Sequence, residues 1–193
     1  NTSGLFAEFS GEELFLIQRE YDQYLQEQGM IDFDDMITKC LSLLSSNQAI
    51  LCRYQKIFQY ILADEFQDIN YPQYEILKLL ALPSNNLFVV GDDDQAIYGF
   101  RGASPGIMKQ FLADYMEGTQ ILLTENYRCG AEIVRLAQQV ICRNKERFIK
   151  EFYPIKAGGT LKSYCFDNRK EEEDELIKQL LNLNLESLTD TAV

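Results

Sequence analysis

Apolar residues follow two different patterns along this chain of 193 residues. In the first third they recur three or four positions apart, which is the spacing of one face of an α-helix. This pattern predicts a helix that starts with the capping-box spacing of Ser10 and Glu13 and ends at Gly29. It predicts two further helices at 34–44 and 49–58. We therefore expect the first third of the chain to be helical.

Beyond this part, short apolar runs alternate with helical patterns. The runs predict strands at 60–63, 87–90, 121–123, 161–166 and from 189 onward. The helical patterns predict helices from Pro72 and at 104–115, 131–142 and 171–183. Strands that alternate with helices form a parallel sheet covered on both faces. Functional groups in such sheets gather beyond the C-terminal ends of the strands, and polar clusters follow the apolar runs here.

Composition narrows the chemistry that the chain can perform. Hydrophobic residues make up 46% of the chain, which is enough for a folded core, and there is no His. The absence of His excludes a Ser-His-Asp triad, a Cys-His dyad and any His-ligated metal site. A net charge of −12 argues against a protein that coats nucleic acid by bulk charge. A local nucleic-acid site stays open, because basic residues outnumber acidic ones between 126 and 150.

The cysteines and the apolar runs indicate in which cellular compartment the protein is located. The five Cys are odd in number and form no CxxC motif, which favours reduced cysteines in a cytoplasmic protein over a disulfide framework. The longest apolar runs, such as the one at 87–90, are too short to span a membrane. We therefore expect a cytoplasmic protein without membrane contact.

Three polar clusters stand where chemistry is expected. The first, at 62–68, places Asp64 and Glu65 after an apolar run, as in the Walker-B arrangement of nucleoside triphosphatases. There the Asp helps to hold Mg²⁺ and the Glu activates the attacking water. The alternative is an ordinary strand-to-helix turn with a capping Asp.

The second cluster, at 90–103, combines three carboxylates, an amide, two aromatic rings and an Arg after a buried run. Gln95 has the chemistry to sense a phosphate, and the aromatic rings can stack on single-stranded bases. A solvated loop with its rings in the core is the alternative. The third cluster, at 123–128, pairs Tyr127 with Arg128, which suit base stacking and contact with a terminal phosphate. A packed Tyr beside a surface Arg is the plainer reading.

Together, and in this order, DEFQD, GDDDQAIYGFRGA and LTENYR resemble motifs II, III and IV of superfamily 1 DNA helicases of the UvrD/Rep/PcrA type. The segments at 31–36 and 55–60 also look like stretches of that family. The resemblance runs from about residue 21 to the end of the chain, and GDDDQAIYGFRGA is its most specific part.

The resemblance implies an ATP-driven motor that moves 3′→5′ on single-stranded DNA and separates duplex. ATP and Mg²⁺ would bind between two RecA-like domains, with DNA across both. Asp64 would bind Mg²⁺ and Glu65 would be the catalytic base. Gln95 would sense the γ-phosphate and Gln67 would couple the ATP site to DNA. The other implied roles are DNA contacts by Phe33, Tyr98, Phe100 and Arg101, stacking of Tyr127 on adenine, and an arginine finger at Arg128.

The resemblance also predicts how the chain is organised. We expect a partial RecA-like α/β sheet preceded by a helical segment. Residues 1–56 would be the helical end of an inserted 1B-like subdomain and the return from it. Residues 57–124 would be the second half of the first RecA-like domain, and 125–193 the start of the second.

No GxxxxGK[ST] phosphate loop occurs in the sequence. The chain is therefore interpreted as an internal piece of a helicase that is inactive alone. Its incomplete sheet would leave an edge open to self-association. Two alternatives remain: the motor of a RecB/AddA-like helicase–nuclease, and a non-catalytic DNA-binding module that kept the shape of the motor.

Overall fold

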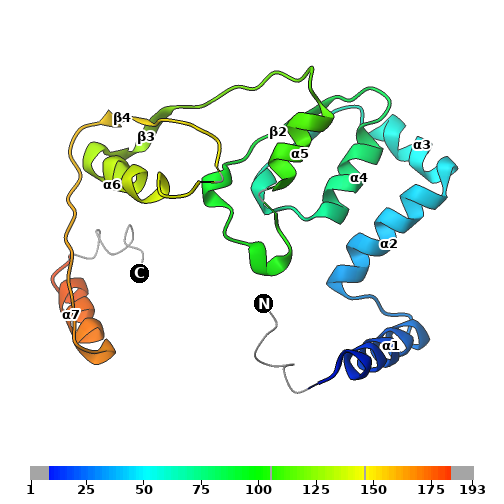
Figure 1. The fold of residues 1–193 in the computed structure, drawn as a ribbon, viewed down its shortest axis with the longest axis horizontal. Coiled ribbons are helices and arrows are strands. Elements are labelled where there is room, and N and C mark those ends of the chain that lie inside the picture. Colours follow the sequence, from blue (N-terminus) through cyan, green and yellow to red (C-terminus); the bar gives the residue numbers. More distant parts are fainter. Residues whose placement is uncertain (1–8, 105, 146, 184–193) are drawn as a thin grey trace. The chain divides into compact units, whose positions relative to one another are not determined.

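The computed structural model describes residues 9–104, 106–145 and 147–183 (Figure 1). The chain divides into two compact units. The first unit runs to Leu122 and also includes Asn144–Ile149, and the second comprises Leu123–Arg143 and the chain from Lys150 onward. Each unit is described by itself, and the three-part division expected from the sequence stays a prediction.

Three helices open the first unit, in agreement with the prediction. They are α1 (Gly11–Glu27), α2 (Phe33–Ser46) and α3 (Gln48–Ile57). The predicted capping box is present, because the Ser10 side chain accepts from the amide of Glu13 while the Glu13 carboxylate accepts from Ser10. Asn47 ends α2 and caps the N-terminus of α3, so the chain turns between them at one residue.

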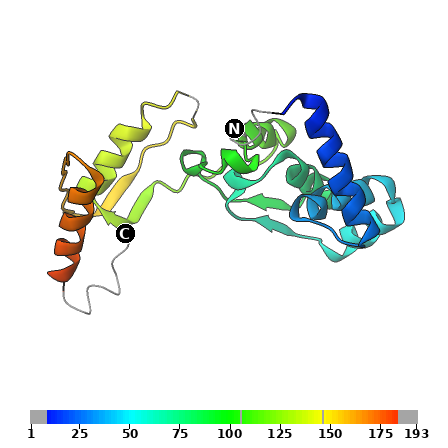
Figure 2. The ribbon, with the colours of Figure 1, turned by 90° about the horizontal axis from the view of Figure 1, so that it is seen from below.

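The sheet of the first unit has two described strands, β1 (Ile61–Ala63) and β2 (Leu87–Val89). They are parallel, as predicted, and can be followed in cyan-to-green colours in Figure 2. Between them lies α4 (Tyr71–Ala81), with Pro72 in its first turn, and α5 (Gly106–Asp114) follows later. The short 3₁₀ helices η1 (Phe66–Asp68), η2 (Asp93–Gln95) and η3 (Gly99–Arg101) follow the strand ends.

The core of this unit lies on one face of the sheet. Phe66, Tyr74 and Ile107 are fully buried there, with Ala63 and Val89 of the strands packed against them. The Phe66 and Tyr74 rings meet edge to face, a favoured aromatic geometry.

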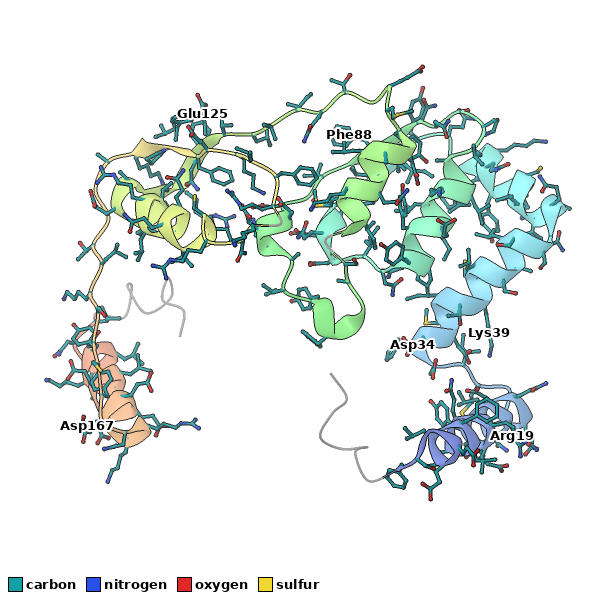
Figure 3. All side chains as sticks on the ribbon, viewed as in Figure 1. Arg19, Asp34, Lys39, Phe88, Glu125 and Asp167 are labelled. Atoms are coloured by element: carbon teal, nitrogen blue, oxygen red, sulfur yellow. The ribbon has the colours of Figure 1, made fainter. Side chains whose placement is uncertain are left out.

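The opposite face of the sheet differs from the expected two-sided covering. Strand residues alternate between faces, and Leu62 and Phe88, on the other face, are 75% and 58% exposed (Phe88 is labelled in Figure 3). Among the described residues, helices cover one face of the sheet only.

The second unit pairs a helix with a second parallel ribbon. Strand β3 (Glu125–Gly130) leads into α6 (Ala131–Ile141), and β4 (Tyr153–Lys156) pairs in parallel with β3 with one irregularity in register. Helix α7 (Arg169–Leu181) follows, capped by Asn168, and carries acidic side chains in its first turn, where they suit the helix dipole.

Three strand predictions in this region need comment. The strand expected at 121–123 is wrong, because the described strand starts at Glu125 and the run before it has no paired neighbour among the described residues. The strand expected at 161–166 is also wrong. The partner of β3 is instead β4 (Tyr153–Lys156), whose Pro154 had masked the signal. The strand expected from 189 onward lies outside the described residues.

All five cysteines are free thiols, in agreement with the prediction. Within the described ranges, no helix is both long and apolar enough to cross a membrane.

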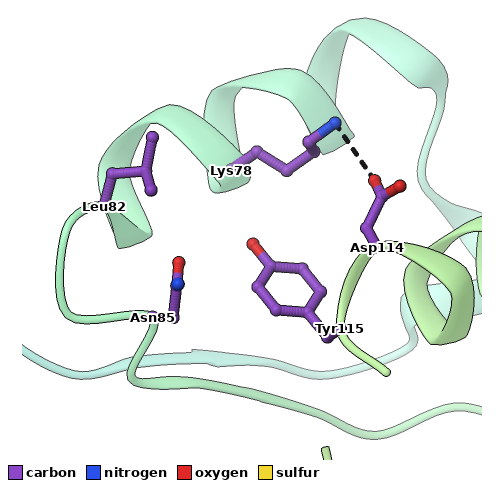
Figure 4. A pocket seen from close by; sticks show the side chains of 5 residues that line it. All are labelled: Lys78, Leu82, Asn85, Asp114 and Tyr115. Atoms are coloured by element: carbon purple, nitrogen blue, oxygen red, sulfur yellow. Dashed lines mark ion pairs between the residues drawn. The ribbon is translucent and has the colours of Figure 1, made fainter. Parts of the chain in front are cut away.

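Helices α4 and α5 are joined by a polar cluster centred on Asp114 (Figure 4). Its carboxylate accepts from the buried Tyr74 hydroxyl at 2.8 Å and from Lys78 Nζ at 3.1 Å. Hydrogen bonds from Tyr74, Gln110 and Lys78 hold the pKa of Asp114 below its usual value. The same contact and burial raise the pKa of Tyr74, burial being the larger cause.

We predict that Asp114→Asn lowers the free energy of unfolding by about 1 kcal/mol near neutral pH, because a hydrogen bond to a charged group is lost. A lowered pKa in the folded state means that the stabilisation is present above the unfolded-state value and lost as pH falls through the folded one. The difference between wild type and variant should therefore shrink in acid, measured by urea denaturation at neutral and acidic pH. A difference that is constant with pH, or equal to that of the exposed Asp22→Asn control, would contradict this origin.

Candidate functional site

The two strands of the first unit end side by side. Ile61 pairs with Leu87 and Ala63 with Val89, so the C-terminal ends are level. The contact continues one step further, because the amide of Phe66 donates to the carbonyl of Val90 at 2.9 Å. The polar segments that follow the two strands therefore start next to each other.

Asp64 and Glu65 lie at the end of β1 and are exposed. Glu65 has a left-handed backbone (φ 49°), which is uncommon for a residue with a side chain and is found where the surrounding structure enforces it. It turns the chain sharply into η1, and Asp64 Oδ1 accepts from the Glu65 amide at 2.9 Å. Protein sites commonly hold Mg²⁺ with one or two carboxylates and phosphate oxygens. The exposed Asp64 carboxylate fits that requirement.

Gln67 joins the two strand ends. Its side chain is buried, with 2% of the residue exposed. The amide nitrogen donates to Glu65 Oε2 at 2.8 Å, and the amide oxygen accepts from the backbone amide of Asp92 at 3.0 Å. A buried amide is costly unless its donor and acceptor are both paired. The two partners therefore fix the direction of the Gln67 side chain.

Asp92 extends this hydrogen-bond network from Gln67 to Gln95. One oxygen of its carboxylate accepts from the amide of Asp94 at 3.1 Å and caps η2, and the other accepts from Gln95 Nε2 at 2.8 Å. Gln95 itself is exposed. The result is one hydrogen-bonded path from Glu65 through Gln67 and Asp92 to Gln95, which links two polar clusters that the sequence had singled out separately.

The aromatic residues of the second cluster lie at η3, with Tyr98 directly before it and Phe100 within it. Tyr98 is partly buried and Phe100 is 74% exposed, with ring centroids 5.8 Å apart. The side chain of Arg101 lies outside the described residues. Phe33 is 87% exposed but begins α2, a separate element. Contacts of these residues with nucleic-acid bases stay predictions.

Tyr127 and Arg128 lie in the second unit, within strand β3 rather than after a strand as expected. The Tyr127 hydroxyl donates to Glu125, which raises the pKa of that tyrosine. The Arg128 amide donates to Asn126 Oδ1 at 3.1 Å. Both side chains are exposed, and the two residues lie in the stretch between Asn126 and Gly130 where the register of β3 is irregular. Tyr127 and Arg128 thus belong to a different unit from the Glu65–Gln95 path, and each unit is described by itself.

The sequence analysis did not single out Arg147, which contacts the loop next to this path. Asp94 forms an ion pair with Arg147, which is 53 positions away along the chain. The only sequence signal was the excess of basic residues between 126 and 150. Asp92, Asp93 and Asp94 could together hold a metal ion by geometry alone. These three aspartates are partly buried and accept from protein donors. Asp64 is exposed and accepts from the Glu65 amide through Oδ1, so it is the more accessible metal ligand.

Comparison with known proteins now adds to this geometry. Residues 7–116 match the model of the UvrD/REP helicase N-terminal domain, which covers more than half of the chain. The chain is 43% identical over 165 residues to the putative ATP-dependent DNA helicase YjcD of Bacillus subtilis. It is 34% identical over 180 residues to the ATP-dependent DNA helicase Rep of Buchnera aphidicola. It is 36% identical over 175 residues to the ATP-dependent DNA helicase PcrA of Staphylococcus epidermidis.

These matches cover most of this chain but a small part of each relative. The aligned regions are 86%, 92% and 90% of this chain, and 22%, 28% and 24% of the relatives. The chain therefore spans about a quarter of the length of the curated relatives that it matches.

We predict that Gly91→Ala disturbs the junction of the two strand ends. A Cβ atom at this position would lie 2.8 Å from Gln67 Oε1 and 3.2 Å from the backbone nitrogens of Phe66 and Gln67. The clash should lower the free energy of unfolding by about 1–3 kcal/mol in urea denaturation, as overpacking does elsewhere. Gly99→Ala is the matched control, because its Cβ would meet nothing within 4 Å. Equal stability of the two variants would show that the close packing at Gly91 is unimportant.

Proposed function

The chain belongs to the UvrD/REP helicase family, and from this premise we propose that it forms part of an ATP-driven motor. The motor would move 3′→5′ along single-stranded DNA and separate duplex. The observation that best supports this is the hydrogen-bonded path from Glu65 through Gln67 and Asp92 to Gln95. A motor that hydrolyses ATP needs its catalytic side chains at fixed positions relative to each other. The hydrogen bonds of this path fix Glu65 and Gln95 in this way.

In the proposed reaction, water attacks the γ-phosphorus of ATP, and the bond from that phosphorus to the β,γ-bridging oxygen breaks so that ADP leaves. The proton of the attacking water passes to the Glu65 carboxylate. Bound Mg²⁺ would neutralise charge on the phosphate oxygens. Asp64 would hold the ion, and Gln95 would donate to the γ-phosphate from the exposed end of η2. Gln67 keeps Glu65 Oε2 hydrogen-bonded, which orients the carboxylate that accepts the proton.

DNA would contact the rings that follow on η3. We propose base stacking on Tyr98 and Phe100, with Arg101 and Phe33 as further contacts. In the second unit, Tyr127 would stack on adenine and Arg128 would act as the arginine finger. We propose that the two units correspond to parts of two RecA-like domains. Self-association through a sheet edge and a cytoplasmic location stay predictions.

We predict that Glu65→Gln in the full-length protein abolishes DNA-stimulated ATP hydrolysis while ATP and DNA still bind. The substitution keeps the shape of the side chain and removes the base, an effect of about 10²–10⁴-fold on kcat. Phosphate release measures turnover, and nucleotide and DNA titrations measure binding. Glu75→Gln, on the exposed side of α4, is the control. Wild-type turnover in Glu65→Gln would remove Glu65 from the role of base.

We also predict that the 193-residue chain by itself does not hydrolyse ATP at a helicase-like rate. Its sequence contains no GxxxxGK[ST] loop, whose backbone amides and Lys cradle the β- and γ-phosphates. The measurement is phosphate release by the purified chain with and without single-stranded DNA. DNA-stimulated release that disappears in Glu65→Gln would overturn this prediction.

A further inference from the structure

Arg147 holds the loop that carries Gln95. Its guanidinium donates from Nε to Asp94 Oδ1 at 2.8 Å and from Nη2 to Asp94 Oδ2 at 2.6 Å. The next residue adds a third contact, because the amide of Phe148 donates to Asp93 Oδ2 at 2.7 Å. Arg147 and Phe148 therefore hold the first two residues of η2, and all four residues belong to the first unit.

This ion pair is well shielded from water. The side chains of Arg147 and Asp94 are only 11% and 9% exposed. Two parallel N–H···O bonds fix the relative orientation of guanidinium and carboxylate, which a single ammonium contact does not. A buried carboxylate that loses its partner is strongly unfavourable, so the loop would have to move to hydrate Asp94.

The position of Gln95 depends on the same loop. Gln95 is the last residue of η2, directly after the two aspartates that are held. Its side chain is exposed and donates to Asp92, which lies on the same loop. The side chain can therefore be aimed correctly only if the loop itself is fixed. Asp92 is fixed on one side by Gln67, and Arg147 fixes Asp94 on the other side.

We propose that Arg147 is a positioning residue for Gln95 in ATP hydrolysis, acting through Asp94. This inference rests on the proposed function, in which Gln95 contacts the γ-phosphate. Arg147 itself touches no reacting atom in this scheme. Its contribution is to keep η2 in the one arrangement that presents the Gln95 amide where charge develops during phosphoryl transfer.

The test uses the full-length protein and compares Arg147→Gln with Lys145→Gln, an exposed basic residue of the same segment. We expect Arg147→Gln to lower kcat for DNA-stimulated ATP hydrolysis by roughly tenfold or more, since small misplacements of reacting groups have effects of this size. The KM for ATP should change far less, because the lost interaction serves the transition state. Lys145→Gln should match wild type.

Two further variants separate positioning from folding. Arg147→Lys restores the charge without the fork and should recover part of kcat. The double variant Asp94→Asn with Arg147→Gln removes both charges and should exceed Arg147→Gln alone, because no buried carboxylate is left unpaired. Should Arg147→Gln fail to fold, these two variants decide the matter. Kinetics equal to wild type in both would overturn the proposal.

Hydrogen exchange gives a readout that does not need activity. The amides of Gln95 and Ala96 donate to the carbonyls of Asp92 and Asp93. Arg147→Gln should speed their exchange while the amide of Ile107 in the core stays protected. Unchanged exchange at Gln95, or unchanged kcat in an active protein, would overturn the role of Arg147. An inactive wild type would contradict the proposed function instead, and the exchange comparison would then decide the inference alone.

Discussion

The buried amide of Gln67 is the contact on which the described site depends. It lies between the ends of two parallel strands that are level in register, and it bonds to one partner from each side. Neither strand end can shift along the sheet without leaving a buried donor or acceptor unpaired. The absence of a side chain at Gly91 is part of the same constraint, because it lets the amide approach the backbone.

The helices and the first sheet could be predicted because their signals are local. The capping box at Ser10, the Pro in the first turn of α4 and the apolar runs of β1 and β2 each act over a few residues. The second ribbon could not be predicted in this way. A strand exists only with a partner. The apolar run at 121–123 has none among the residues that the structure describes, whereas Tyr153–Lys156, which contains a Pro, is paired.

In the candidate site, too, local signals could be predicted and contacts between distant residues could not. Asp64, Glu65 and Gln95 were predicted from short motifs, since each motif is a stretch of adjacent residues. The bonds that organise them join Gln67 to Asp92 across 25 positions and Asp94 to Arg147 across 53. Such pairings are decided by how the chain folds, and no residue spacing announces them. A motif thus identifies the groups that we propose for the chemistry more readily than the residues that hold them in place.

Contacts between distant parts of the chain also explain how three consecutive aspartates can lie near the carboxylates of Asp64 and Glu65. Like charges this close would repel in a loop that left them all to solvent. Here each of the three is directed at different donors: Asp92 at the amides of its own turn, Asp93 at the Phe148 amide and Asp94 at Arg147. The negative charges of these three aspartates are compensated by donors within the protein. Asp64 and Glu65, in contrast, are exposed at the end of β1. The nucleotide site that we propose would need that separation, because a metal-bound phosphate would approach the strand end more readily where the surrounding negative charge is already compensated.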